Sequence, residues 1–277
     1  MSSFGAEPEA PLAHAGAPRL DLDRARTAGE LLSAAFEIYV RYWRGFLVMA
    51  LAVVIPLDLG IYGLIGEELF SGYHPEIGPG QAILVFVEPL LLTVPLVTAV
   101  HVRAVQAIGV GQRPPVRAAL RQGFSDLPVV ATAVLLAFLA TVAGFIVLIV
   151  PGVYIGVRLA FCAQAVVVEG HRGFGALDRS WNLVRATWWR TFGILVLLNV
   201  ISSAASSILA QPVNALARSA DSGPILLASE IVANTIAYSF TALAATLLFF
   251  DLRARRAGAQ PRAGKPVGLE RPERVEG

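Results

Sequence analysis

Six long stretches of the chain are almost continuously hydrophobic, and short polar segments separate them. They cover residues 45–66, 82–104, 128–150, 152–169, 191–216 and 224–250. Their lengths approach or exceed the ~20 residues that a helix needs to cross a bilayer core, and they lack the in–out alternation of barrel strands. The pattern therefore predicts an all-α polytopic membrane protein with six transmembrane helices. We place this domain at 27–258, between a disordered cytoplasmic arm (1–26) and a disordered cytoplasmic tail (259–277).

The positive residues alternate between the segments that flank these stretches. From the N-terminus to the C-terminus, the Lys and Arg counts are five, none, four, none, four, one and seven. Because cytoplasmic loops are enriched in Lys and Arg, both termini are predicted to lie in the cytoplasm. The lipid bilayer itself is then the first expected partner.

Three amphipathic segments precede the first, third and fifth stretches and resemble one another. Each has apolar or aromatic residues spaced i, i+4, i+7, which is one face of a helix. The residues are Leu32, Phe36 and Tyr39; Leu120, Phe124 and Leu127; and Leu177, Trp181 and Val184. The pattern favours three repeats of an interfacial helix plus two spans; the alternative is that similar solvation of the three helices produces the similarity. Thr27 and Glu30 have the spacing of a capping box at the start of the first segment.

Two aromatic–basic pairs, Trp43-Arg44 and Trp189-Arg190, stand where such helices would enter the membrane. The amphipathic helices either adhere to anionic lipid headgroups or only cover the ends of the helix bundle. The functional alternative is that they form a docking surface for a membrane-protein partner.

Composition narrows the classes of protein further. Hydrophobic residues make up 56% and charged residues 15% of the chain, and the mean hydropathy is +0.65. These values exclude a nucleic-acid-binding basic domain and a largely disordered protein. The single cysteine, Cys162, excludes an intramolecular disulfide and is expected to be a small packing residue.

Four ionisable residues interrupt the hydrophobic stretches at similar expected depths. Asp58, Glu88, Arg158 and Glu230 lie six to eight residues from the predicted outer ends of their spans, which is roughly 9–12 Å. A charge in the bilayer centre is costly, so these side chains should face inward and find partners. We expect a charged layer in which Arg158 pairs with at least one acid. This charged layer is either an ion pair that fixes the order in which the helices pack, or a site for a polar headgroup or for protons.

Catalytic and metal-binding patterns are missing from the sequence. No zinc-protease, zinc-finger, phosphate-loop or nucleophile-elbow spacing occurs, and an intramembrane hydrolase would need a nucleophile–base pair that the sequence does not identify. The acidic loop residues Glu67, Glu68, His74 and Glu76 are expected to be solvated. We therefore expect no enzyme activity, metal, cofactor or nucleic-acid partner.

A distinctive pattern lies at 151–193. A Pro-Gly pair opens a span, an Arg lies within it, a Glu closes it, and an Ala-Leu-x-x-Ser-Trp helix and an aromatic–Arg step follow. The residues are Pro151, Gly152, Arg158, Glu169, Ala176, Leu177, Ser180, Trp181, Trp189 and Arg190, with Asp251 and Arg253 in a later Asp-Leu-Arg. This pattern resembles the glycerophosphoryl diester phosphodiesterase membrane-domain family and related bacterial six-helix membrane proteins of unknown function.

The resemblance implies a six-helix domain of the bacterial inner membrane. It does not imply phosphodiesterase activity, because catalysis in the fused relatives belongs to a separate barrel domain that this chain lacks. The sequence favours a non-enzymatic structural, regulatory or partner-binding membrane module. The alternative is a transporter or lipid-handling protein that uses the charged layer.

The topology can be tested with reporter fusions. Reporters placed within 67–81 and within 103–126 should lie on opposite sides of the membrane, because only the second segment carries Arg residues. Reporter activity that placed both segments on one side would contradict the six-span topology.

Overall fold

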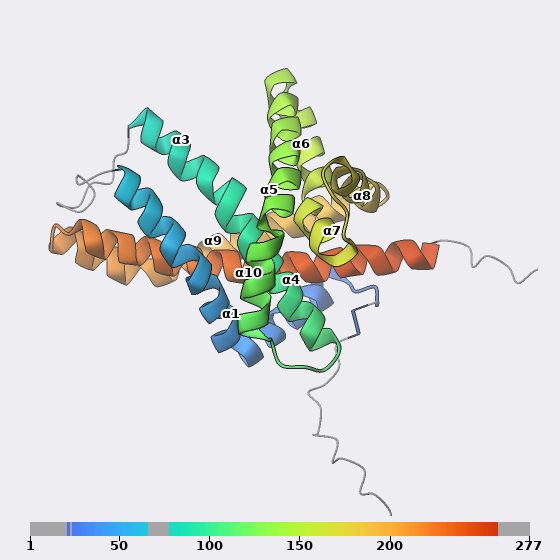
Figure 1. Cartoon of the computed structure of the whole chain (residues 1–277), viewed down its shortest axis with the longest axis horizontal. Helices are drawn as coiled ribbons and strands as arrows, with labels where there is room; N and C mark the ends of the chain where they lie inside the picture. Colours follow the sequence, from blue (N-terminus) through green and yellow to red (C-terminus); the bar gives the residue numbers. More distant parts are fainter. Residues whose placement is uncertain (1–20, 23, 66–77, 260–277) are drawn as a thin grey trace, which may run out of the picture.

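The described part of this computed structural model comprises residues 21–22, 24–65 and 78–259, which form helices joined by short turns (Figure 1). No strand occurs among these residues, which confirms the all-α fold class. The acidic loop residues Glu67, Glu68, His74 and Glu76 lie outside them. The helices are α1 (Ala28–Ile65), α3 (Pro79–Glu88), the π-helix η1 (Pro89–Thr93), α4 (Val94–Gly109), α5 (Val116–Val147), α6 (Ile149–Leu159), α7 (Cys162–Glu169), α8 (Phe174–Val184), α9 (Trp188–Ser219) and α10 (Gly223–Ala259).

Six helical segments of the described chain are long and apolar enough to cross a membrane. They are Ala28–Leu64, Ala82–Gly109, Val116–Val147, Ile149–Glu169, Trp188–Ser219 and Gly223–Gly258. The predicted set of six spans, and with it a multi-pass membrane protein, is confirmed. The first and third segments begin well before the predicted starts because the preceding amphipathic residues continue the same helix.

The three amphipathic segments have different local structures despite their similar sequences. The first joins its span through a kink at Tyr42, whose φ and ψ are −118° and 20°. The second continues without a break into α5, which has Pro128 inside it. Only the third is a separate helix, α8, and Gly170 and Gly173 in the turn before it have positive φ values of 73° and 48°. Glycine adopts such values without steric cost, so the turn can redirect the chain there.

The buried face of the first segment is one residue away from the predicted one. Leu31, Ala35 and Ile38 belong to the core, whereas Phe36 is 64% exposed. A shift of one residue turns a helix face by about 100°. Phe36 of the predicted apolar face therefore lies away from the core, and Ala35 is the residue that is buried there.

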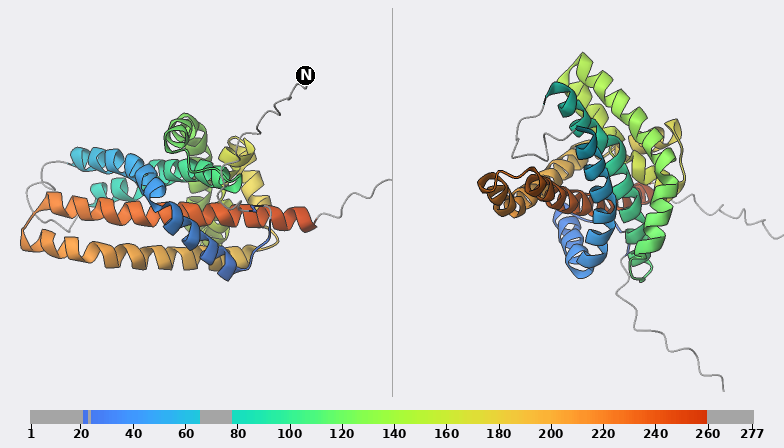
Figure 2. Two further views of the ribbon diagram at one scale, coloured as in Figure 1. Left: turned by 90° about the horizontal axis from the view of Figure 1, so that it is seen from below. Right: turned by 60° about the vertical axis from the view of Figure 1, so that its left-hand side comes forward.

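Helix α10 is the centre of the packing. It lies beside α9 over most of its length, and α1, α4 and α8 also contact it (Figure 1; Figure 2). The largest fully buried side chains include Phe46 of α1, Phe161, and Phe249 and Phe250 of α10. His101 of α4 is also buried in this core, and its Nε2 lies 2.9 Å from the Ser239 hydroxyl of α10.

Helices α5 and α6 form a hairpin that turns at Leu148. Leu148 is extended, with φ −167° and ψ 160°. The sequence placed this turn at residues 150–152, but Pro151 lies in the first turn of α6, where its missing N–H costs no helical hydrogen bond. A Cβ atom on Gly144 would lie 2.9 Å from the Cα of Gly152. The two glycines therefore permit the close contact between the helices.

Candidate functional site

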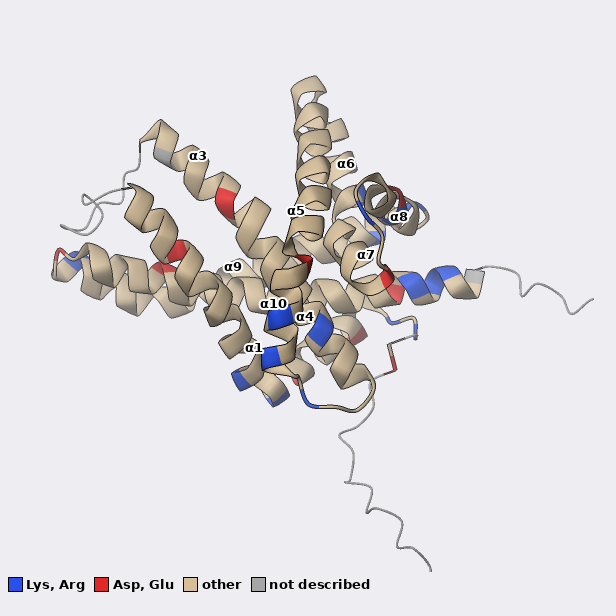
Figure 3. Ribbon diagram, in the orientation of Figure 1, with Lys and Arg blue, Asp and Glu red and all other residues tan. Residues whose placement is uncertain are grey.

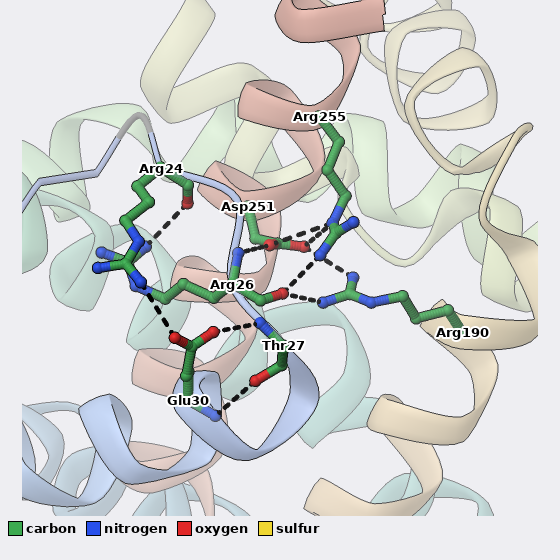
Figure 4. Close-up of polar contacts among 7 residues, drawn as sticks. All are labelled: Arg24, Arg26, Thr27, Glu30, Arg190, Asp251 and Arg255. Carbon is green, nitrogen blue, oxygen red and sulfur yellow. Dashed lines mark hydrogen bonds and ion pairs between the residues drawn. The ribbon is translucent and has the colours of Figure 1, made fainter.

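Asp251 of α10 joins three segments of the chain at one buried carboxylate (Figure 4). Its side chain has no exposed surface. The backbone N–H of Arg26 donates to Oδ1 over 2.6 Å, Arg190 Nη1 donates to Oδ2 over 2.7 Å, and Arg255 Nε donates to Oδ2 over 3.1 Å. Charge-assisted hydrogen bonds of this kind are stronger than neutral ones. We call these four residues the Asp251 junction.

The same two arginines also bind the backbone before α1. The carbonyl oxygen of Arg26 accepts from Arg190 Nη2 over 2.8 Å and from Arg255 Nη2 over 2.5 Å. The next residue, Thr27, begins the predicted capping box. The Thr27 N–H donates to Glu30 Oε2, and the Glu30 N–H donates to Thr27 Oγ1. The capping box is confirmed, and the contacts of Arg26 directly precede it.

Three acids from three helices form an acidic layer: Asp58 of α1, Glu88 of α3 and Glu230 of α10. Asp58 lies within electrostatic range of both glutamates. The Asn234 side chain donates to Asp58 Oδ2 over 3.3 Å, and the Thr93 hydroxyl donates to Glu88 Oε1 over 2.7 Å. These donors are neutral, so they do not cancel the charge of the carboxylates.

The predicted pairing of Arg158 with this layer is wrong. The Arg158 guanidinium donates to the carbonyl oxygen of Trp181 over 2.9 Å and to the Tyr154 hydroxyl. It lies over the rings of both residues, 4.6 Å from the Trp181 centroid and 4.9 Å from that of Tyr154. The charged residues thus divide into an acidic layer and a separate, aromatic-bound arginine.

The fourth span is broken directly after Arg158. The sequence suggested one straight helix over 152–169, but α6 ends at Leu159 and α7 begins at Cys162. Helix α8 packs beside this break, so Arg158 faces α8 rather than the acids. Figure 3 shows acidic residues on α1 and α3, apart from most of the basic residues.

The Ser-Trp pair stabilises the break between α6 and α7. The Ser180 hydroxyl donates to the carbonyl oxygen of Arg158 over 2.8 Å and accepts from the Phe161 N–H over 3.1 Å. It therefore satisfies backbone groups that the interrupted helix leaves without partners. Hydropathy gives no indication of this role, because Ser180 acts on residues in a different helix.

Glu169 holds α8 from the other side of the break. Its Oε1 accepts from Arg179 Nη2 over 2.7 Å, and its Oε2 lies 3.4 Å from His171 Nε2. The hydrogen bond to Glu169 raises the pKa of Arg179 above its ordinary value. Glu169, like Ser180, therefore positions α8 against α7.

The two aromatic–basic pairs are not equivalent. Arg44 lies 5.4 Å from the Trp43 ring centroid, and both side chains are exposed. Arg190 instead turns inward to the Asp251 junction, while Trp189 stays 78% exposed. Arg253, the last motif residue, lies over the Phe250 ring at 4.8 Å.

The structure also reveals a serine–histidine contact that the sequence did not suggest. His101 Nδ1 lies 2.8 Å from the Val97 carbonyl oxygen, and Nε2 faces Ser239. Both His101 and Ser239 have no exposed surface. The pair therefore connects α4 to α10, and a substrate has no access to it.

Cys162 is also buried, as expected of a packing residue. Among the described residues, no three His, Cys, Asp or Glu side chains are placed to hold a metal ion.

Residues 44–252 match the profile of the family described as Domain of unknown function (DUF7847). The matched range includes the three acids of the acidic layer, Arg158 and Asp251. The resemblance to glycerophosphoryl diester phosphodiesterase membrane domains finds no support, whereas a family of unknown function is compatible with the second part of that resemblance. No curated protein and no solved structure matches the chain.

Replacing Asp251 with Asn should destabilise the protein strongly. The substitution keeps the volume but leaves Arg190 and Arg255 without their shared carboxylate, and loss of one member of a buried ion pair costs about 3–5 kcal/mol. Tryptophan fluorescence during denaturation in detergent would measure the change. Asp178→Asn is the matched control, because Asp178 is exposed and its carboxylate accepts from Asn182 of the same helix. Equal unfolding midpoints for the two variants would contradict the importance of the junction.

Proposed function

The chain belongs to the DUF7847 family, and we propose that it is a non-enzymatic membrane module that docks onto a second membrane protein in a structural or regulatory role. We further propose that it resides in the inner membrane of a bacterium with both termini in the cytoplasm. Its amphipathic helices would then lie at the cytoplasmic membrane surface, in contact with anionic headgroups and with the partner.

The observation that carries this proposal is an uncovered apolar face on α1. Phe36, Val40 and Trp43 are 64%, 53% and 47% exposed. Phe36 and Val40 are one helical turn apart on the same side of the helix, and Trp43 directly follows the kink at Tyr42. Apolar anchors of this kind are typical of a helix that docks in a groove. We call these three residues the Phe36 stripe. The core takes its contacts from the other side of the helix, so the fold leaves the stripe free to bind.

Two sets of hydrogen bonds keep the start of α1, and with it the Phe36 stripe, in an ordered position. The capping box fixes the first turn of α1, and the Asp251 junction fixes the residue before it. Arg41 and Arg44 flank the stripe and lie over the rings of Tyr42 and Trp43. A face that is already ordered loses less conformational entropy when it binds.

Photo-crosslinking from position 36 should test the docking role. A photoreactive phenylalanine analogue at Phe36 should give one discrete protein–protein product in native membranes, and Trp43→Ala should reduce that product because it removes a neighbouring anchor. The same analogue at Phe86, which is 76% exposed on α3, is the matched control. Crosslinks to lipid alone from position 36 would contradict the proposal.

The acidic layer supports a second candidate, a transporter or lipid-handling protein. Asp58 and Glu88 are buried, and Tyr238 lies within electrostatic range of all three acids. Their positions on α1, α3 and α10 would let a cationic or zwitterionic group contact three helices at once. Intramembrane acids are often parts of substrate or proton pathways.

Under this second candidate, Asp58→Asn together with Glu230→Gln should abolish transport while the fold is retained. The measurement is proton-coupled uptake or lipid redistribution in vesicles, and the matched control is Asp126→Asn, which removes the partner of Arg103 outside the layer. Unchanged activity in the double variant would exclude the acidic layer from the function.

A further inference from the structure

A pocket of about 650 Å³ lies between α6 and the first turns of α9. Its apolar wall includes Val150, Val153 and Phe192, and its polar groups are Arg158, Arg185 and Thr187. Trp188 and Trp189 complete the lining. The pocket thus combines a cationic part with an apolar part, and its apolar residues continue into the exposed side of α6.

Arg158 brings an uncompensated positive charge to this pocket. The residue is only 7% exposed, and among the described residues no carboxylate pairs with it. Two of its nitrogens donate to the oxygens of Trp181 and Tyr154, but its Nε has no hydrogen-bond partner. A buried charge is costly unless a partner compensates it. Aromatic rings and neutral oxygens supply only part of that compensation.

A second buried polar group in the pocket also lacks a partner. The hydroxyl oxygen of Thr187, in the turn between α8 and α9, is buried without a hydrogen bond. Arg185, two residues earlier, is exposed. Three donors from two parts of the chain therefore line one pocket, and among the described residues neither Arg158 Nε nor the Thr187 hydroxyl has an acceptor there.

We infer that this pocket binds the phosphate group of an anionic phospholipid. The phosphate would accept hydrogen bonds from Arg158, Arg185 and Thr187, since arginine is well suited to phosphate oxygens. The acyl chains would lie along Val150, Val153 and Phe192. Trp188 and Trp189 fit a position at the membrane–water interface, where tryptophan is enriched.

The apolar wall favours a lipid over free phosphate as the source of this group. A soluble anion would leave Val150, Val153 and Phe192 without a contact, whereas an acyl chain would cover them. The site is separate from the Phe36 stripe and from the acidic layer. The inference therefore goes beyond the proposed function and can fail without affecting it.

Native mass spectrometry of the full chain would test the site. Protein released from nanodiscs should retain phosphatidylglycerol in preference to phosphatidylcholine. Arg158→Gln should lower that retention at least about tenfold, as expected from loss of a charged hydrogen-bond donor. Arg218→Gln is the matched control, because Arg218 is an exposed arginine in the last turn of α9, outside the pocket. Its retention should equal that of the unmodified protein.

A second variant tests the same site without changing Arg158, in case Arg158→Gln does not fold. Arg185→Gln combined with Thr187→Val leaves Arg158 and its stacking in place and should also lower retention of phosphatidylglycerol. Equal retention by this variant and the unmodified protein would overturn the inference, as would equal binding of phosphatidylcholine. Displacement of the lipid by excess inorganic phosphate, with equal protection against unfolding, would overturn the lipid as the source.

Discussion

A carboxylate that is shut off from solvent must find its hydrogen-bond donors within the protein, and Asp251 finds them on segments far apart in the chain. Arg26 lies 225 residues before it, and Arg190 lies at the start of α9. The junction thereby fixes the beginning of α1, which carries the Phe36 stripe. It also fixes the first turn of α9, which carries Trp188, Trp189 and Phe192. Both proposed binding surfaces therefore depend on one ion-pair cluster.

Among the described residues, Arg158 forms no ion pair with the three acids of the acidic layer. Asp58 and Glu88 accept hydrogen bonds from Asn234 and Thr93, and Arg158 lies between aromatic rings. Neutral dipoles and ring faces stabilise a buried charge less than an opposite charge does. Part of each charge therefore stays uncompensated within the described residues, and the acids lie apart from Arg158.

Several of the motif residues hold neighbouring segments of the chain together. Ser180 bonds both sides of the break between α6 and α7, Glu169 holds Arg179 of α8, and Asp251 holds the chain before α1. These contacts give the residues structural roles. Arg158 differs from them, because part of its hydrogen-bonding capacity and most of its charge remain without a partner.

Local sequence determined the number of spans, the helical class and the capping box at Thr27 and Glu30. Hydropathy is set by successive residues, and the two hydrogen bonds of a capping box join residues three positions apart, so neither depends on distant contacts. The tertiary structure decided which face of α1 is buried, where the fourth span breaks and which groups surround Arg158. A change of one residue in helix phase put Ala35 rather than Phe36 in the core. The break at Ala160 and Phe161 depends on Ser180 of another helix, and Asp251 meets Arg190 only after α9 and α10 have packed. Such contacts form between residues that are distant in the chain, and their geometry is set by how the helices fit together.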